Sequence, residues 1–268
     1  MTDISIAVAQ FSPSADRVKN RERVRGLIGE AASAGAQLIV LPEYSSFCSA
    51  RLGQHFVENA ETIDGPFVTA VSDAARTNSI WVIAGLVERS TEKARFSNAL
   101  VALDQAGNLA TTYRKQHLYE AFGARESQWV IPGNAGAPST ITVEGLTVGL
   151  QTCYDLRFPE VTRTLVDAGA HAIAVAAQWF DGPAKKHHWD TLIAARSIEN
   201  TVYVAAADQS GPVAIGSSQI VDPLGITLAS LDAEPGIALA PASLARVLEV
   251  RKTNPALRQR RYRVEAIR

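Results

Sequence analysis

The sequence of 268 residues lacks several features that mark particular classes of protein. It holds two cysteines, Cys48 and Cys153, which are too few for a disulfide framework. Its 26 basic and 27 acidic residues leave a net charge of −1, whereas a nucleic-acid-binding protein normally has a basic excess. No apolar run approaches the roughly 18 residues that a membrane span needs. We therefore expect no nucleic-acid or membrane partner.

Metal-binding and export signals are also missing. The pair His187–His188 lies in a basic loop, and no Cys/His cluster has the spacing of a structural zinc site, so we expect no metal. Residues 1–5 have neither the basic nor the apolar region of a signal peptide. Together with the few cysteines, this favours a reducing, cytoplasmic location.

What the chain does have is 47% hydrophobic residues, enough for a large core. Short apolar runs alternate with helical patterns, which predicts an α/β sandwich. The i, i+3, i+4, i+7 spacing of Val24, Leu27, Ile28 and Ala31 predicts one helix, and Pro66 is placed to begin another. The predicted strands are 4–9, 37–41, 80–85, 98–103, 109–113, 147–152, 171–176, 201–207 and 218–221, with a hairpin turn at 104–108.

The two halves of the chain resemble each other faintly. Each runs strand, helix, Ala-Gly-Ala and strand, with the Ala-Gly-Ala steps at 34–36 and 168–170. This is either chance similarity of common α/β pieces or a sign of two sheets related by a pseudo-twofold axis and faced by helices. In the second case Glu43 and Trp179 follow equivalent strands. No linker separates the halves, so we expect a single domain spanning residues 1–268.

Three chemically useful side chains follow predicted strands. Glu43 comes after a buried strand and Pro42, Lys115 ends another strand, and Cys153 lies where a strand meets a turn. Each alone is ordinary, as a solvated carboxylate, a surface lysine or a small buried thiol. Together they supply a nucleophile, a base and a cation for an oxyanion. His117 is an alternative base for the thiol.

The segments that carry these residues resemble the signature blocks of the nitrilase superfamily of carbon–nitrogen hydrolases. The similar segments are 41–43, 113–118, 153–160, 178–180, Trp189 and 195–204. The resemblance implies an α-β-β-α sandwich of two mixed sheets. It also implies homodimers or larger oligomers, and we expect residues from about 245 to 268, which include the basic tail 258–263, to form a contact arm.

The resemblance also implies roles for individual residues. Glu43 would be the general base, Lys115 the oxyanion stabiliser and Cys153 the nucleophile, with the backbone N–H of Tyr154 as second oxyanion donor. The family commonly has a further glutamate between the lysine and the cysteine. Glu126 fits best because a Pro-Gly turn at 132–133 follows it, and Glu120 is the alternative. No cofactor is implied.

The residues after the nucleophile indicate the branch. The string Cys-Tyr-Asp-Leu-Arg-Phe-Pro-Glu resembles the branch of omega-amidases and amidases of deaminated glutathione, whereas true nitrilases typically continue Trp-Glu. Arg157 would pair with a substrate carboxylate, or else with Glu160 or Asp155 in a structural role. We expect Tyr44, Trp179 and Phe180 to line the pocket.

The predicted function is hydrolysis of a small linear carboxamide, possibly the omega-amide of a carboxylic acid, through a thioester. Nitrile hydrolysis and N-carbamoyl amide hydrolysis use the same groups and are the enzymatic alternatives. A catalytically silent redox-sensing or interaction protein is the alternative of another class. We expect Cys48 to be a buried thiol without a task, and Trp189 to pack on a helix face with Leu192 and Ile193.

Overall fold

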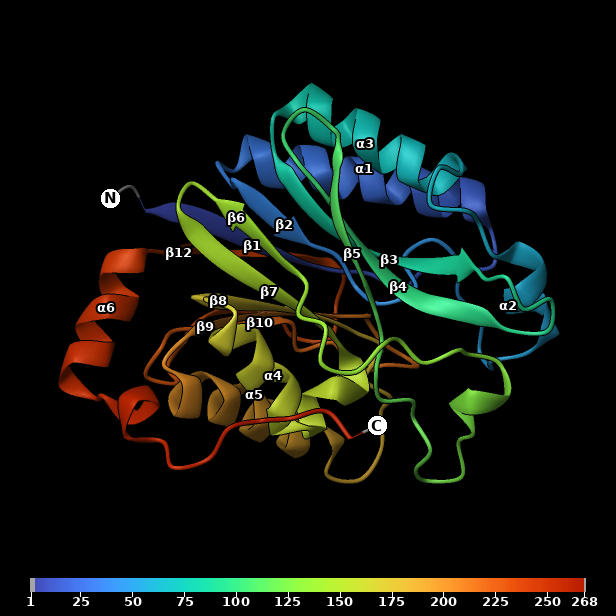
Figure 1. Cartoon of the computed structure of the whole chain (residues 1–268). Coiled ribbons are helices and arrows are strands. Elements are labelled where there is room, and N and C mark those ends of the chain that lie inside the picture. The colour runs from blue at the N-terminus through green and yellow to red at the C-terminus, as the bar shows by residue number, and fades with distance from the viewer. Residues whose placement is uncertain (1–2, 268) are drawn as a thin grey trace.

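The computed structural model describes residues 3–267, which form four layers: a helix pair, two sheets and a second helix pair (Figure 1). The strands are β1 (Ile4–Gln10), β2 (Leu38–Val40), β3 (Trp81–Arg89), β4 (Phe96–Leu103), β5 (Leu109–Arg114), β6 (Thr140–Val143), β7 (Leu146–Thr152), β8 (Ala172–Ala177), β9 (Tyr203–Asp208), β10 (Gln219–Val221), β11 (Thr227–Ser230) and β12 (Gly236–Ala242). The α-helices are α1 (Arg17–Ser33), α2 (Gln54–Asn59), α3 (Pro66–Asn78), α4 (Pro159–Asp167), α5 (Lys185–Asn200) and α6 (Leu244–Thr253). Short 3₁₀ helices are η1 (Glu126–Gln128), η2 (Cys153–Arg157) and η3 (Ala256–Gln259).

The two sheets repeat one arrangement. The first sheet has the order β12-β1-β2-β3-β4-β5 and the second has β6-β7-β8-β9-β10-β11. In each, the second, third and fourth strands are parallel and the outer strands are antiparallel. The faint resemblance between the halves therefore reflects a repeated topology, and the predicted sandwich of two mixed sheets is confirmed.

All nine predicted strands are present, with ends that shift by up to four residues. The strand predicted from Thr201 begins at Tyr203, because Thr201 caps α5 in the left-handed conformation with φ 50°. Strands β6, β11 and β12 were not predicted. β6 has four residues and β11 is mostly exposed, while β12 is apolar but contains Pro241 and lies at a sheet edge.

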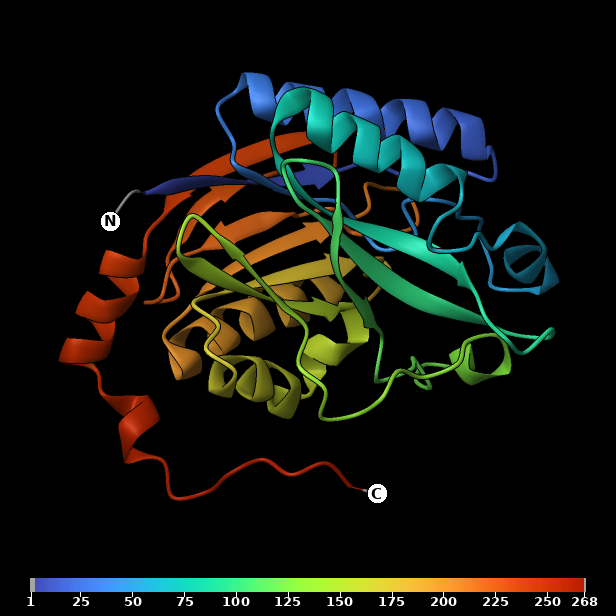
Figure 2. The ribbon, with the colours of Figure 1, turned by 45° about the horizontal axis from the view of Figure 1, so that its top comes forward.

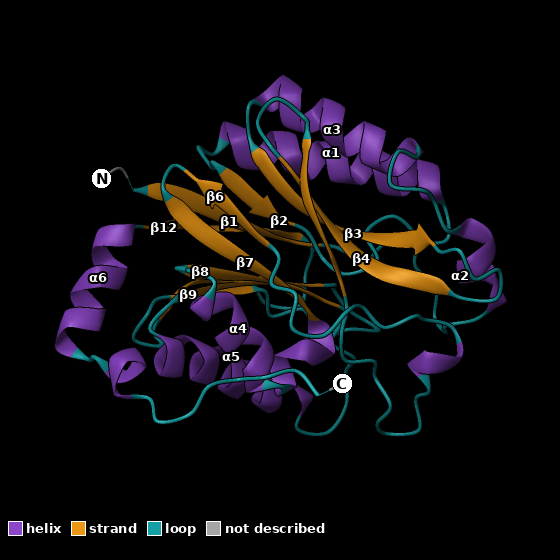
Figure 3. Cartoon of the chain, in the orientation of Figure 1, coloured by secondary structure: helices purple, strands orange, loops and turns teal. Residues whose placement is uncertain are grey.

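Three apolar cores bind the layers together. The central core lies between the sheets and includes Val8, Val40 and Leu150. Helices α1 and α3 cover the outer face of the first sheet, and α4 and α5 cover the outer face of the second (Figure 3). Trp189 and Ile193 of α5 are fully buried there and Leu192 packs against them, as predicted.

Local signals fix the helix ends. Asp16 accepts hydrogen bonds from the backbone N–H groups of Val18 and Lys19 and so caps α1. Pro66 begins α3, where its missing N–H leaves no donor unpaired, as predicted. No helix within residues 3–267 combines the length and apolarity needed to cross a bilayer.

The C-terminal segment leaves the body of the sandwich after α6 and runs below α4 and α5 (Figure 2). Arg260 pairs with Asp167 of α4 at 2.6 Å, while Tyr262 is 92% exposed. Its role as a contact arm stays a prediction.

Gly85 in the middle of β3 lets the chain after β2 pack directly on the first sheet. A Cβ at this position would lie 2.6 Å from the backbone nitrogen of Tyr44 and closer still to the carbonyl oxygen of Pro42. These neighbours are backbone atoms and cannot swing aside. The path of the segment that carries Glu43 therefore depends on the missing side chain at residue 85.

We expect Gly85→Ala to lower the free energy of unfolding by about 1–3 kcal/mol, because the new methyl group displaces backbone. The matched control is Gly26→Ala on the exposed face of α1, where a Cβ would meet nothing within 4 Å. That variant should gain about 0.5–1 kcal/mol, since alanine is the better helix former. Denaturant titration of both variants measures the contrast, and equal stability of the two would contradict the close packing at Gly85.

Candidate active site

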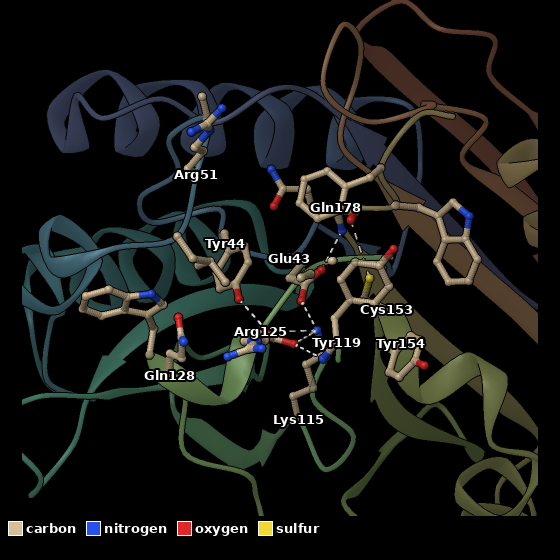
Figure 4. Close-up of a pocket in the computed structure, with 18 of the residues that line it drawn as sticks. Glu43, Tyr44, Arg51, Lys115, Tyr119, Arg125, Gln128, Cys153, Tyr154 and Gln178 are labelled. Atoms are coloured by element: carbon tan, nitrogen blue, oxygen red, sulfur yellow. Dashed lines mark hydrogen bonds and ion pairs between the residues drawn. The ribbon is translucent and has the colours of Figure 1, made fainter. Parts of the chain in front are cut away.

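Four segments far apart in the sequence meet at one pocket. Glu43 follows β2, Lys115 follows β5, Cys153 follows β7 and Gln178 follows β8, and all four line a cavity of about 350 Å³ (Figure 4). β2, β7 and β8 lie in the parallel parts of the two sheets, and the carboxyl ends of parallel strands are where α/β proteins commonly place their ligands. The three side chains that the sequence singled out are thus brought together.

Lys115 lies between two carboxylates. Its Nζ donates to Glu43 Oε1 at 3.1 Å and to Glu126 Oε1 at 3.0 Å, and all three side chains are almost completely buried. Burial alone would lower the pKa of Lys115, but the charges of Glu126 and Glu43 outweigh it and hold the pKa well above its usual value. Lys115 is therefore a fixed cation in the pocket.

Glu43 is held by groups from both sheets. Asn98 of β4 donates to Oε1 at 2.6 Å, and the backbone N–H of Gln178 donates to Oε2 at 2.7 Å. Burial raises the pKa of Glu43, and the nearby charge of Glu126 raises it further, against the lowering effect of Lys115. A carboxylate with a raised pKa is a stronger base than an exposed glutamate.

Cys153 lies at a bend between β7 and η2, with φ 45°, in the left-handed region that side chains rarely adopt. Its thiol donates to the carbonyl oxygen of Gln178 at 3.6 Å. Burial and then the charge of Glu43 raise the pKa of the thiol well above its usual value. The resting sulfur is therefore protonated and needs a base to become a nucleophile.

The bend at Cys153 is fixed by a buried carboxylate. Asp155 Oδ2 accepts from Tyr113 Oη at 2.6 Å and from the backbone N–H of Thr152 at 3.2 Å, which completes a capping box with Thr152. His117 donates its backbone N–H to Asp155 Oδ1, and its ring Nδ1 lies 2.9 Å from the same oxygen. His117 thus faces Asp155, not the thiol, and it does not line the pocket.

The structure separates the two candidates for the further glutamate. Glu126, at the start of η1, is 3% exposed and accepts from Lys115, from Tyr44 Oη at 2.9 Å and from the backbone N–H of Tyr119 at 2.6 Å. Glu120 is exposed and caps the N–H of Ser127 at 2.7 Å instead. Glu126 is the one that reaches Lys115.

The residues expected to contact substrate all line the cavity. Tyr154, Arg157, Trp179 and Phe180 come from the second half of the chain, and Tyr44 from the first. Arg157 forms no ion pair with Glu160 or Asp155, which are the structural partners that the sequence allowed. Its guanidinium instead lies 4.9 Å from the Trp179 ring centroid.

Several residues of the site were missed at the sequence level. Asn98 and the backbone of Gln178 hold Glu43, and Gln209 donates to the carbonyl oxygen of Glu43 at 2.8 Å. Lys185 also lines the pocket. Asn98 had one available signal, since it begins the predicted strand 98–103, which comes just before the predicted strand 109–113 that leads to Lys115.

Cys48 lies behind the pocket. Its sulfur is 3.2 Å from Gln178 Nε2, and burial raises the pKa of this thiol to about 11. It is a buried thiol, as predicted. Within residues 3–267, no group of three or more His, Cys, Asp or Glu side chains is arranged to hold a metal ion.

The arrangement joins a buried thiol, a carboxylate of raised pKa and a fixed cation, and this combination of groups is suited to acyl transfer. Residues 5–252 match the carbon–nitrogen hydrolase family. The chain is 39% identical over 257 residues to the deaminated glutathione amidase of Escherichia coli O157:H7, covering 96% of this chain and 97% of that one. It is 32% identical over 279 residues to the human omega-amidase NIT2, covering 100% and 98%.

The fold comparison agrees with these matches. Nit3 of Saccharomyces cerevisiae, a member of branch 10 of the nitrilase superfamily, superposes with a TM-score of 0.86 at 26% identity, covering 97% of each chain. The resemblance seen in the short motifs therefore extends over almost the entire chain and its fold. This protein belongs to the carbon–nitrogen hydrolase family of the nitrilase superfamily.

Proposed function

We propose that this protein hydrolyses the C–N bond of a small linear carboxamide to a carboxylic acid and ammonia. The observation that carries the proposal is the meeting of Cys153, Glu43 and Lys115, from three strand ends, in one small cavity. The names of the E. coli and human relatives, both amidases, support the choice of an amide as substrate.

In the proposed first half of the cycle, Glu43 takes the thiol proton while the sulfur of Cys153 attacks the carboxamide carbon. The ammonium of Lys115 and the backbone N–H of Tyr154 stabilise the developing oxyanion. Tyr154 is the second residue of η2, and first-turn N–H groups have no acceptor within their own helix. Glu43 then protonates the leaving nitrogen, which departs as ammonia and leaves a thioester.

In the second half, Glu43 removes a proton from water, which attacks the thioester carbon. The same oxyanion donors act again, and the thiol is restored as the acid leaves. Glu126 acts as a positioning residue, since it holds Lys115 by a charge-assisted hydrogen bond and aligns the substrate nitrogen. The cycle uses side chains and water, and calls for no metal or organic cofactor.

We also propose that the chain forms a single domain and works in the cytoplasm as a homodimer or larger homo-oligomer. Both cysteines are unpaired thiols, which suits a reducing compartment. The segment of about 245–268 carries strongly exposed side chains, including Tyr262 at 92% and Ile267 at 96%, that a neighbouring subunit would cover.

A substrate panel tests the reaction. We expect ammonia release from linear amides and little from nitriles or N-carbamoyl compounds of the same length. Intact-mass analysis of the mixed protein and amide should reveal an acyl adduct on Cys153. The adduct should vanish in Cys153→Ala and persist in Cys48→Ala, which removes the other thiol. A protein that releases no ammonia from any amide would refute the proposal.

Replacing Lys115 by a neutral side chain should slow turnover while the fold stays nearly intact. We expect Lys115→Met to lower kcat/KM by about 10²–10³-fold, because a principal oxyanion donor is lost. Its melting temperature should also fall, because two buried carboxylates lose their counter-ion. Lys19→Met, an exposed surface variant, is the control and should retain full activity. Wild-type kcat/KM in Lys115→Met, with circular dichroism unchanged, would remove the oxyanion assignment.

The acid limb of the pH–rate profile should report Glu43. Glu43 acts as a base only when it is ionised, and its pKa is raised above the usual glutamate value of 4.5. As the pH is lowered, kcat/KM should therefore begin to fall at a pH above 4.5. The hydrogen bond from Asn98 lowers this pKa, so Asn98→Ala should move the limb to still higher pH. A limb that stays in place or moves to lower pH in Asn98→Ala would argue against Glu43 as the base.

A further inference from the structure

Asp208 is a buried carboxyl group that the proposed cycle does not use. It is the last residue of β9, is completely buried and does not line the pocket. Among the ion pairs formed within residues 3–267, none includes Asp208, and its Oδ2 atom is buried without a hydrogen-bond partner. Burying a carboxyl group in this way is costly, so its presence calls for an explanation.

Asp208 holds a peptide group just beyond the end of the neighbouring strand. The pairing of β8 with β9 runs as far as Ala177 and Asp208. Beyond that pair, the backbone N–H of Trp179 donates to Asp208 Oδ1 at 2.7 Å. A side-chain oxygen thus supplies the acceptor that this buried N–H needs where the strand pairing has ended.

The peptide group that Asp208 holds is also bound to the nucleophile. The C=O of Gln178 and the N–H of Trp179 belong to one planar trans unit and point in opposite directions. The C=O accepts from the thiol of Cys153 at 3.6 Å. Because the unit is rigid, a hydrogen bond that fixes its N–H on one side also fixes the direction of its C=O on the other.

The preceding peptide group reaches the base. The N–H of Gln178 donates to Glu43 Oε2 at 2.7 Å, so Gln178 contacts both Glu43 and Cys153 through its main chain (Figure 4). Without the hydrogen bond to Asp208, the peptide group after Gln178 can rotate about the soft backbone dihedrals and turn its C=O away from the thiol. The alignment of base and nucleophile therefore depends on a carboxyl group that is hydrogen-bonded to neither.

Asp208 is itself held in place. Its backbone N–H donates to Ser218 Oγ at 2.9 Å, and this hydroxyl donates to the carbonyl oxygen of Asp208 at 3.3 Å. The backbone N–H of Ser218 donates in turn to Gln10 Oε1 at 2.9 Å, and Gln10 belongs to β1 of the other sheet. All three residues are completely buried. The carboxyl group therefore projects from a rigid support.

The electrostatics of Asp208 suit this task. Burial raises the pKa of Asp208 well above its usual value, against the lowering effect of the hydrogen bond from Trp179, and the charge of Glu43 raises this pKa as well. A raised pKa favours the neutral carboxyl group, which accepts from a peptide N–H without adding a negative charge near the base. An asparagine side chain is neutral and has the same acceptor oxygen.

We propose that Asp208 is a positioning residue. It holds the peptide group of residues 178–179, and through this group it aligns the thiol of Cys153 with the carboxylate of Glu43. The inference rests on the proposed function for the roles of thiol and base, and it adds a residue outside the pocket to the reaction. A misplacement of about 1 Å between reacting groups can slow a reaction about 100-fold. The buried carboxyl group thus serves reactivity although it costs stability.

Three substitutions separate positioning from a structural role. Asp208→Ala removes the acceptor, Asp208→Leu also fills the space, and Asp208→Asn keeps the acceptor. With a linear amide as substrate, the Ala and Leu variants should lower kcat by about 10- to 100-fold and change KM by less than about threefold, since Asp208 does not line the pocket. Asp208→Asn should keep kcat within about threefold of wild type. Wild-type kcat in folded Asp208→Ala, or an Asn variant as slow as the Ala variant, would overturn the proposal.

Asp222→Ala is the matched control, because it removes another buried carboxylate beside the same sheet. Asp222 follows β10, accepts from the backbone N–H groups of Leu224 and Ile226 at 2.9 and 3.0 Å, and does not line the pocket. This variant should lower the melting temperature and leave the kcat of the folded protein unchanged. An equal loss of kcat in Asp222→Ala would mean that turnover follows general stability, and would contradict a positioning role.

Alkylation by iodoacetamide reports the alignment without amide turnover. The reagent reacts with a thiolate, so its rate at Cys153 depends on how readily Glu43 removes the thiol proton. We expect Asp208→Ala to slow alkylation of Cys153 at least about tenfold and Asp208→Asn to restore it, as followed by peptide mass analysis. A purely structural role would instead loosen the site and speed alkylation of Cys153 and Cys48 alike. That result, or an unchanged rate, would refute the proposal.

The two measurements also separate this proposal from the amidase function. If the wild-type protein hydrolyses no amide while Asp208→Ala still slows alkylation of Cys153, the amidase function fails and the positioning role stands. If amides are hydrolysed while alkylation and kcat are the same in Asp208→Ala and wild type, the positioning role fails alone. Where the Ala and Leu variants do not fold, Asp208→Asn decides, because slowed alkylation in that folded variant would overturn the role and a wild-type rate would support it.

Discussion

The buried ammonium of Lys115, held between Glu43 and Glu126, is the interaction on which the rest of the site depends. An uncompensated charge in such a place would be strongly destabilising, so every partner must be in position at once. Asn98 donates to Glu43 Oε1, which also accepts from Lys115, and the backbone N–H of Gln178 donates to Oε2. Catalytic alignment and compensation of the buried ammonium charge are therefore one requirement here.

The repeated topology of the two sheets meets that requirement. Each half places a polar residue of the pocket shortly after its second parallel strand: Glu43 follows β2 in the first sheet and Gln178 follows β8 in the second. Face-to-face packing through the central core then brings Glu43 against Gln178 across the interface. A side chain from one half is thus oriented by the main chain of the other.

The sequence was informative where the signal is local. Glu43 and Cys153 follow strands that apolar residues reveal, Lys115 follows a strand that comes after a recognisable hairpin turn, and short motifs surround all three. The contacts that Asn98 and Lys185 make could not be found in this way, because they depend on how distant segments pack. Glu126 and Glu120 lie on an irregular stretch without periodicity, and only the fold shows which one turns inward. Strand β12 was not predicted, and its pairing partner β1 lies at the other end of the chain.

Gln178 joins the two reacting groups through its main chain. Its N–H binds the carboxylate of Glu43 and its C=O accepts from the thiol of Cys153, while its side chain points to Cys48. Because peptide groups are common to every amino acid apart from the missing N–H of proline, this link does not depend on the identity of the side chain. Substitution of Gln178 during evolution by a residue other than proline therefore keeps the main-chain link between Glu43 and Cys153.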